Sequence, residues 1–383
     1  MKTIKIGINN KLVSIKENSW NENQLGYYLA GLIEGDGSII VPETTRNEKG
    51  KLLPFHSSKI QILINSENIP YSFQTGKLNK RFKSTYLNPK GKFNCLHPYY
   101  VTGFTDGEAS FVILVLKRAL YKTGWNIVPV FTISLNSRDR VLLEKIQSFF
   151  GGIGNITIRK KDNSVYFTVK SVKDIVNVII PHFDKYPLLT EKQADFELFK
   201  QIVIMMHNKQ HLNTKGLNKI LSLKASLNRG LTALLTKHFP NIDPIKRPVR
   251  KNLFKNLDPN WVTGFVEAEG CFFINTIKSE IYKTGYQIKL NFSIVQHIRD
   301  KILMESFVNY FNSGAVYVET QHVTYLITKF SDIQDKIIPF FQKHPLQGYK
   351  FSDYNKFCRV GELMKNKAHL TKQGIEEIIK IKK

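Results

Sequence analysis

A long internal repeat constrains this chain more than any other feature of its sequence. The stretch Val101–Phe111, VTGFTDGEASF, recurs 161 positions later as Val262–Phe272, VTGFVEAEGCF. The tetrapeptide YKTG at Tyr121 recurs at Tyr282 with the same offset. Single residues extend the match: Phe131 and Phe292, Ile133 and Ile294, Asp139 and Asp300. Self-similarity at a fixed offset over this length indicates two copies of one structural unit.

Later in each copy the offset shortens to 158, and the match continues through the C-terminal part. The pairs at this offset are Asp174 and Asp332, Pro181 and Pro339, Lys185 and Lys343, Pro187 and Pro345, His211 and His369, and Gly216 and Gly374. We therefore predict two domains, 98–245 and 256–383. The segment 246–255 contains Pro248 and five lysines and arginines, a composition that predicts a linker.

The charge balance points to a polyanionic partner. Lysine and arginine number 56 against 31 aspartates and glutamates, a net charge of +25. Nucleic acid is the first candidate and an anionic membrane surface the second, with a merely solvated basic surface as the neutral alternative. No apolar run reaches the roughly 18 residues of a membrane helix, and the N-terminus lacks the apolar core of a secretory signal.

The three cysteines show no paired spacing. Cys95, Cys271 and Cys358 stand far apart and form no CxxC motif. This pattern predicts a reducing compartment without a disulfide framework. Cys271 falls in an apolar stretch, so we expect it in the core.

The pattern of apolar residues predicts an α+β domain in each copy. In the first copy the motif is helical, residues 111–116 and 127–135 are strands, and 141–150 is a helix, supported by the pair Arg140 and Glu144. Residues 157–160 and 165–170 form a second hairpin, and 172–183 and 193–207 form two more helices. The order is α-β-β-α-β-β-α, with a further helix at the end, around a four-stranded antiparallel sheet.

The two motifs place small residues one helical turn apart, directly before an acid. The small residues are Gly103 and Gly107 in the first copy and Gly264 and Ala268 in the second. Residues at i and i+4 share a helix face, so two such helices can pack with their backbones almost in contact. Glu108 and Glu269, which follow the second small residues, would then lie side by side.

Two adjacent carboxylates repel each other unless cations lie between them. Oxygen ligands suit Mg²⁺, which binds through one or two carboxylates together with phosphates and water. On a basic protein this arrangement predicts metal-dependent hydrolysis of a phosphodiester. The neutral alternative is that each motif is only a helix-packing element, but packing does not require an acid at 108 or 269.

The motifs resemble those of the LAGLIDADG homing endonucleases. Leu29–Gly37 reads LAGLIEGDG, nearly the family signature, and the two later copies are similar to the variant found in the single-chain branch of fungal organellar introns. The resemblance covers nearly all of 98–383. It implies two pseudo-symmetric domains whose sheets form a saddle over double-stranded DNA. It also implies two or three divalent ions that are shared with the scissile phosphates, and we expect these ions to be Mg²⁺.

One face of the strand at 288–294 is a candidate DNA surface. Apolar residues alternate there with Lys289, Asn291 and Ser293, so one face packs on a core and the other is free for a ligand. Lysine, asparagine and serine can contact phosphates and base edges. A plain solvent-facing sheet would show the same pattern.

Three further residues are similar to functional positions of the family. Gln296 follows that strand, where the family often keeps a polar group near the metals and the attacking water. Its counterpart Leu135 makes the two halves unequal. Lys329 resembles the family's basic active-site residue. Lys170 is a less regular equivalent in the first half, which we assign to DNA binding, and either lysine could instead be a solvated strand end.

The first motif lacks a full repeat of its own. Gly31 and Gly35 form its small pair and Asp36 takes the acid position, but the next motif begins only 72 residues after Leu29. Residues 69–97 contain six lysines and arginines and no acid, which is typical of a basic tether. We interpret 1–97 as a truncated domain of the same kind, and an added DNA-binding arm is the alternative. We do not expect Asp36 to be active.

Together these features predict a monomeric, Mg²⁺-dependent, double-strand DNA endonuclease with an internal pseudo-two-fold axis. Because its halves have diverged, its target should be non-palindromic. The resemblance implies an intron-encoded protein of mitochondria. Two alternatives stay open: an intron maturase, which binds intron RNA on the same fold, and a DNA-binding regulator without catalysis.

Overall fold

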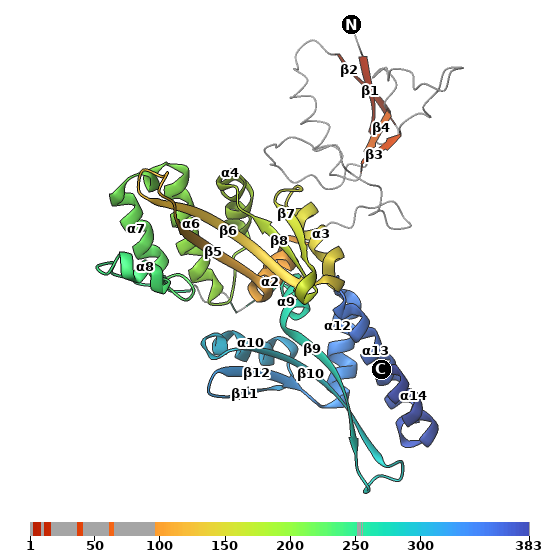
Figure 1. The fold of residues 1–383 in the computed structure, drawn as a ribbon. Coiled ribbons are helices and arrows are strands. Elements are labelled where there is room, and N and C mark those ends of the chain that lie inside the picture. The colour runs from red at the N-terminus through yellow and green to blue at the C-terminus, as the bar shows by residue number, and fades with distance from the viewer. Residues whose placement is uncertain are drawn as a thin grey trace. The chain divides into compact units, whose positions relative to one another are not determined.

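The computed structural model describes residues 96–250, 254 and 256–382, together with strand residues 3–8, 11–16, 37–40 and 61–64. The chain divides into two compact units, Met1–Thr85 and Tyr86–Lys383 (Figure 1). In the described part of the chain, no helix has the length and apolar character to span a membrane.

The first unit contains a four-stranded sheet in the order β2-β1-β4-β3. Its strands are β1 (Thr3–Ile8), β2 (Lys11–Lys16), β3 (Gly37–Ile40) and β4 (Gln61–Ile64). The pairs β1–β2 and β3–β4 are antiparallel, and β1–β4 is parallel. β3 begins directly after the first motif, just as a strand follows each later motif. The predicted motif residues Gly31, Gly35 and Asp36 themselves lie outside the described residues.

The second unit begins with the first of the two repeated halves. Its elements are α2 (Pro98–Glu108), β5 (Ala109–Lys117), β6 (Trp125–Asn136), η2 (Ser137–Asp139), α3 (Arg140–Phe149), β7 (Asn155–Arg159), η3 (Lys160–Asp162), β8 (Ser164–Val169), α4 (Val172–Asp174), η4 (Ile175–Ile179), α5 (Ile180–Lys185), α6 (Lys192–His207), η5 (Gln210–Leu212), α7 (Thr214–Ala225) and α8 (Ala233–His238).

The second half repeats this order up to the counterpart of α7, except that its described residues include no counterpart of η3. Its elements are α9 (Pro259–Glu269), β9 (Gly270–Lys278), β10 (Tyr286–His297), η6 (Ile298–Asp300), α10 (Lys301–Phe311), β11 (Ala315–Val318), β12 (His322–Ile327), α11 (Phe330–Asp332), η7 (Ile333–Ile337), α12 (Ile338–Lys343), α13 (Lys350–Lys365), η8 (Ala368–Leu370) and α14 (Lys372–Lys382).

The two halves contain equivalent antiparallel sheets, β5-β6-β8-β7 and β9-β10-β12-β11, which confirms the α+β prediction. Their registers match: Phe111 pairs with Phe131, and Phe272 pairs with Phe292 at the same place. Along β10, alternate side chains are buried against helices. Each sheet therefore packs one face on its own core and leaves the other face more open.

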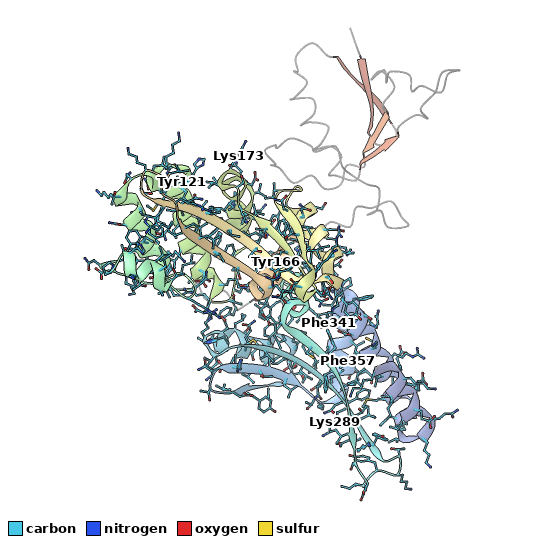
Figure 2. The ribbon with its side chains drawn as sticks, in the orientation of Figure 1. Tyr121, Tyr166, Lys173, Lys289, Phe341 and Phe357 are labelled. Atoms are coloured by element: carbon cyan, nitrogen blue, oxygen red, sulfur yellow. The ribbon has the colours of Figure 1, made fainter. Side chains whose placement is uncertain are left out.

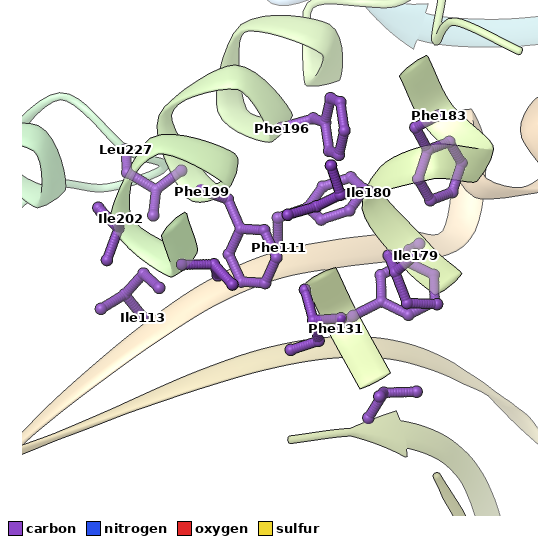
Figure 3. Packing of buried hydrophobic residues seen from close by; sticks show 14 of the residues in the cluster. Phe111, Ile113, Phe131, Ile179, Ile180, Phe183, Phe196, Phe199, Ile202 and Leu227 are labelled. Carbon is purple, nitrogen blue, oxygen red and sulfur yellow. The ribbon is translucent and has the colours of Figure 1, made fainter. Parts of the chain in front are cut away.

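Each half has its own aromatic core. The ring of Phe111 packs against Phe131, Phe183, Phe196 and Phe199 (Figure 3). In the second half Phe272 packs in the same way against the residues Phe292, Phe341, Tyr354 and Phe357. Because the two cores bury the same positions of the repeat, each half is built as a domain.

The helix predicted over 172–183 is interrupted by a π-helical turn, η4. Pro181 follows that turn near the start of α5, and proline has no backbone N–H to donate to the preceding turn. The π-helical turn is wider than an α-helical one, so the α-helical hydrogen bond that Pro181 cannot donate is not required there. The second half repeats the arrangement with η7 before Pro339.

Two expectations differ from the structure. Cys271 is exposed rather than in the core, because Gly270 and Phe272 occupy the inward positions of β9 and Cys271 falls between them. The helices α7 and α14 were not predicted. Each begins after a left-handed residue and a short 3-10 turn, which breaks the apolar periodicity that precedes it.

Candidate active site at the ends of two helices

The helices α2 and α9 pack against each other through their small residues (Figure 1). A Cβ atom on Gly103 would lie 2.0 Å from the carbonyl oxygen of Trp261, and one on Gly264 would lie 2.0 Å from that of Tyr100. A Cβ on Gly107 would lie 2.3 Å from the Cβ of Ala268. The helix backbones are therefore almost in contact at all three places, and side chains larger than these cannot fit without moving the helices.

Both helices begin with the same local signals. Pro98 and Pro259 take the first helical position, where the missing N–H costs nothing. The side chains of His97 and Asp258 accept hydrogen bonds from the first helical amides. Because α2 and α9 begin with the same signals and have the same length, their C-terminal ends lie next to each other.

Two buried acids join the helices by crossed hydrogen bonds. The indole Nε1 of Trp261 donates to Oδ2 of Asp106 at 2.8 Å, and the hydroxyl of Tyr100 donates to Oε2 of Glu267 at 3.1 Å. Asp106 and Glu267 are equivalent positions of the repeat, as are Tyr100 and Trp261. The sequence showed these acids but gave no signal for their partners in the other half.

Glu108 and Glu269 are the last residues of α2 and α9 and are half-buried. The position of a Cβ on Gly107 is 3.3 Å from Oε1 of Glu269, so that carboxylate lies over the residue next to Glu108. Burial and the charge of Glu269 raise the pKa of Glu108 to about 7. Burial also raises the pKa of Glu269. The pair is thus under electrostatic strain that a cation would relieve.

Two lysines that we did not predict from the sequence lie beside this pair of glutamates. Lys192 Nζ donates to the carbonyl oxygens of Thr105 (3.0 Å) and Gly107 (2.8 Å) at the end of α2. Lys350 Nζ donates to Val266 (3.0 Å) and Ala268 (3.1 Å) at the end of α9.

The two ammonium groups neutralise the helix C-termini and oppose part of the rise in the pKa of both glutamates. Burial in turn lowers the pKa of Lys192 to about 8 and lowers that of Lys350. One signal was available in the sequence, because these lysines match each other at the 158-residue offset.

Gln296 reaches the pair from the second half only. Its side chain hydrogen-bonds to Glu269 and so opposes the rise that burial causes in the pKa of that carboxyl. Its counterpart Leu135 lines a cleft that also contains Glu108 and Lys350. The environment of one acid is therefore more polar than that of the other.

Lys170 and Lys329 lie apart from the pair. Both side chains are exposed, and Lys329 is the N-cap of α11 with its charge near Asp332. Of the hydrogen bonds and ion pairs found among the described residues, none joins either lysine to Glu108 or Glu269. Lys192 and Lys350 are the lysines that lie at the helix ends carrying the two acids, and a catalytic role for Lys329 stays a prediction.

The predicted DNA surface lies on the open face of β10. Lys289 is exposed (Figure 2), and Asn291 and Ser293 are partly exposed. The Asn291 Oδ1 atom is shielded and has no hydrogen-bond donor among the described residues. Val130, the residue of the first half that corresponds to Asn291, is 7% exposed beside its cross-strand neighbour Val112, so it offers little surface to DNA.

Glu108 and Glu269 can supply some, but not all, of the ligands that a divalent metal needs. Within the described residues no lysine or arginine forms an ion pair with either carboxylate. The described part of the chain contains no group of three His, Cys, Asp or Glu side chains able to hold a metal. A metal at Glu108 and Glu269 would thus take its remaining ligands from water or a bound phosphate, as Mg²⁺ commonly does.

The family model for LAGLIDADG endonucleases matches residues 101–203 and 262–361 of the chain. The chain is 42% identical over 298 residues to the probable intron-encoded endonuclease 2 of Neurospora crassa, covering 75% of this chain and 64% of that protein. It is 30% identical to the probable intron-encoded DNA endonuclease 1 of Mycosarcoma maydis, covering 67% and 96%. The chain thus spans somewhat less than two thirds of the Neurospora relative.

Solved structures match the same two-domain part. I-SmaMI bound to cleaved DNA shares 42% identity at a TM-score of 0.73, covering 75% of this chain and 96% of that one. I-LtrWI bound to target DNA shares 41% identity at a TM-score of 0.72, covering 74% and 96%. I-SmaMI has also been solved with an uncleaved DNA target in the presence of calcium ions.

Proposed function

The chain belongs to the LAGLIDADG endonuclease family, and from that premise we propose that it is a site-specific, metal-dependent endonuclease for double-stranded DNA. One observation carries the proposal: α2 and α9 bring Glu108 and Glu269 together at equal helix ends, with raised carboxyl pKa values. A basic chain with two such acids matches the chemistry of phosphodiester hydrolysis. The two DNA-bound relatives of known structure support it.

In this proposal Glu108 and Glu269 would hold divalent ions, and we expect two or three Mg²⁺ shared with the scissile phosphates. Bound metal would supply Lewis-acid polarisation of the phosphate and a more acidic water. Gln296 orients the Glu269 carboxylate by its hydrogen bond. Calcium in a related structure agrees with divalent ions in such a site.

We assign the positive charge of the active site to Lys192 and Lys350. Both ammonium groups are fixed at the helix ends that carry the acids, so they add a preorganised positive potential where negative charge develops during cleavage. Lys329 and Lys170 are exposed and suit contacts to the DNA backbone instead.

We propose that the open face of β10 reads DNA through Lys289, Asn291 and Ser293. The unpaired oxygen of Asn291 supports this, because a shielded acceptor without a donor is costly unless a partner supplies one. An adenine N6 or a cytosine N4 amino group in the major groove could donate to it.

We further propose the boundaries 98–245, 246–255 and 256–383 for first domain, linker and second domain, with 1–97 as a truncated extension. The antiparallel pair β3–β4 directly after the first motif supports the extension's kinship with the two full domains. Several relatives come from fungal introns, including cox1 and ND4 introns. A mitochondrial, intron-encoded origin is proposed on this basis. A monomeric state is proposed because the two halves of one chain already pack on each other through α2 and α9.

The deciding experiment incubates the purified full chain with Mg²⁺ and a duplex that carries the intron-free insertion site. A defined double-strand cut is expected, and EDTA should abolish it. Uncut DNA in Mg²⁺ and Mn²⁺, combined with tight binding to the intron RNA, would favour the maturase instead.

A further inference from the structure

The two lysines beside the acid pair stand at the start of helices whose preceding loops are held from the opposite half. Lys192 and Lys350 are the first residues of α6 and α13. A lysine at a helix start is unfavourable for the helix dipole, so its position must be fixed by other contacts. The ammonium groups donate to carbonyl oxygens at the ends of α2 and α9. The short loops 188–191 and 346–349 determine where α6 and α13, and with them the two lysines, begin.

In the first half, Asp300 of the second half holds the loop. Its Oδ1 accepts a hydrogen bond from the amide of Glu191 at 2.9 Å, directly before Lys192. Asp106 accepts the preceding amides of Leu189 (2.9 Å) and Thr190 (3.0 Å). The start of α6 is thus fixed by one acid from each half.

In the second half, Asp139 of the first half has the same role. Its Oδ1 accepts a hydrogen bond from the amide of Tyr349 at 2.7 Å, directly before Lys350. Glu267 accepts the amides of Gln347 (2.6 Å) and Gly348 (3.1 Å). Asp139 and Asp300 are equivalent positions of the repeat, so the exchange between halves is reciprocal.

The linker breaks this symmetry. Nη1 of Arg250 donates a hydrogen bond to Oδ1 of Asp300, and the two side chains are 6% and 2% exposed. Arg250 also lies 3.7 Å from the Glu191 carboxylate. Among the ion pairs of the described residues, Asp139 has Arg138 as its partner, at 3.7 Å and with a solvent-exposed side chain. Burial raises the pKa of Asp300, while the guanidinium of Arg250 and the amide of Glu191 oppose that shift.

We propose that Asp139 and Asp300 are positioning residues that act across the pseudo-two-fold axis: each fixes the loop that places the lysine of the other half beside the acid pair. Arg250 reinforces one of the two. The inference rests on the proposed endonuclease function. Loss of one anchor should misplace one lysine and leave the other in place, so cleavage of one strand should suffer more than cleavage of the other.

The test uses the full chain and a target duplex labelled in two colours, one on each strand. Asp139→Ala is expected to slow one strand by roughly tenfold to a hundredfold, the loss typical of a small misplacement of a reacting group, so that nicked duplex accumulates. Asp300→Ala/Arg250→Met removes the other anchor together with the guanidinium that it would leave unpaired and buried. It should accumulate a nick in the opposite strand.

Two controls separate positioning from general damage. Asp139→Asn keeps the acceptor oxygen and should restore the balance between the strands, whereas a purely electrostatic role would not be rescued. Backbone hydrogen exchange of the free protein should rise around 346–350 in Asp139→Ala and around 188–192 in the double variant, each without a change in the other loop.

The inference is overturned if the wild type cuts normally while both variants slow the two strands equally, or nick the same strand. Unchanged exchange in both loops also overturns it. A wild type that cuts no DNA overturns the proposed function, and the exchange measurement then decides alone whether the loops are anchored across the halves.

Discussion

The indole Nε1 of Trp261 donates a 2.8 Å hydrogen bond to the buried carboxylate of Asp106 on the neighbouring helix. The same carboxylate accepts the Thr190 hydroxyl at 2.6 Å and two loop amides. One side chain thus links α2, α9 and the loop that leads to Lys192. Helix packing and placement of the active-site lysine are therefore parts of one network.

Close approach of the helices gives the first prediction. Gly103→Ala places a methyl group 2.0 Å from the Trp261 carbonyl oxygen, which no rotamer change can relieve. We expect the free energy of unfolding to fall by more than about 3 kcal/mol, at the upper end of overpacking effects, measured by urea denaturation. Gly361→Ala on α13 is the matched control. Its methyl would meet Ile338 Cδ1 at 3.2 Å, so stability should change by less than about 1 kcal/mol.

The acid pair gives the second prediction. Glu108→Gln and Glu269→Gln should each abolish double-strand cleavage, because an amide replaces a negatively charged metal ligand. Binding to target DNA in a gel-shift assay without divalent metal should change little, because affinity comes mainly from lysine and arginine at phosphates. Glu376→Gln, exposed on α14, is the control. Wild-type cutting by either active-site variant would refute the assignment.

The third prediction concerns pH. The folded pKa of Glu108 is about 7 against an ordinary value of 4.5. A raised folded pKa means that the folded state binds the proton more tightly. The contribution to stability is therefore fully present below about pH 4.5 and is lost as pH rises to 7.

Without divalent metal we expect the unfolding free energy to fall across that window by up to roughly 3 kcal/mol from this group. Urea titrations at several pH values check this. Glu108→Gln should flatten the dependence, and Mg²⁺ should restore stability at pH 7 in the wild type. A wild-type profile identical to that of the variant would contradict it.

The lysines give the fourth prediction. Lys192→Met or Lys350→Met should slow cleavage at saturating Mg²⁺ by roughly a hundredfold, the usual loss when one preorganised donor is removed from a site, with affinity nearly unchanged. The exposed Lys170→Met and Lys329→Met should instead weaken binding and reduce its salt dependence. Single-turnover rates and salt titrations separate the two effects. If only Lys329→Met lost cleavage rate, the catalytic role would belong to Lys329 and not to Lys192 or Lys350.

Much of the fold was predictable because the repeat reports equivalent positions directly. The four-stranded sheets, the small-residue contact and the convergence of Glu108 and Glu269 follow from periodicity and spacing. Contacts such as Asp300 with Glu191 were not predictable, because they join the two halves over long separations and no local pattern encodes them. Lys192 was missed for the same reason: its ammonium acts on another helix, far from its own place in the sequence.

The fifth prediction concerns the DNA target and follows from how the open faces differ. Lys289, Asn291 and Ser293 in β10 stand where the first half has Val128, Val130 and Thr132. Thr132 is already bonded to the Phe167 carbonyl oxygen at 3.1 Å, so this part of the first half offers few free polar groups, whereas the second half offers an amine and an unpaired amide oxygen.

Identical surfaces read identical half-sites, so unlike surfaces should select a non-palindromic target. Each wrong base at a direct contact should cost roughly 1–3 kcal/mol. Asn291→Ala should relax selectivity at one or two adjacent positions in one half-site and leave the other half-site unchanged. Selection of cleavable sites from a randomised library, for wild type and variant, measures both effects. A palindromic consensus, or two protein chains per bound duplex, would contradict the prediction that β6 and β10 read different half-sites.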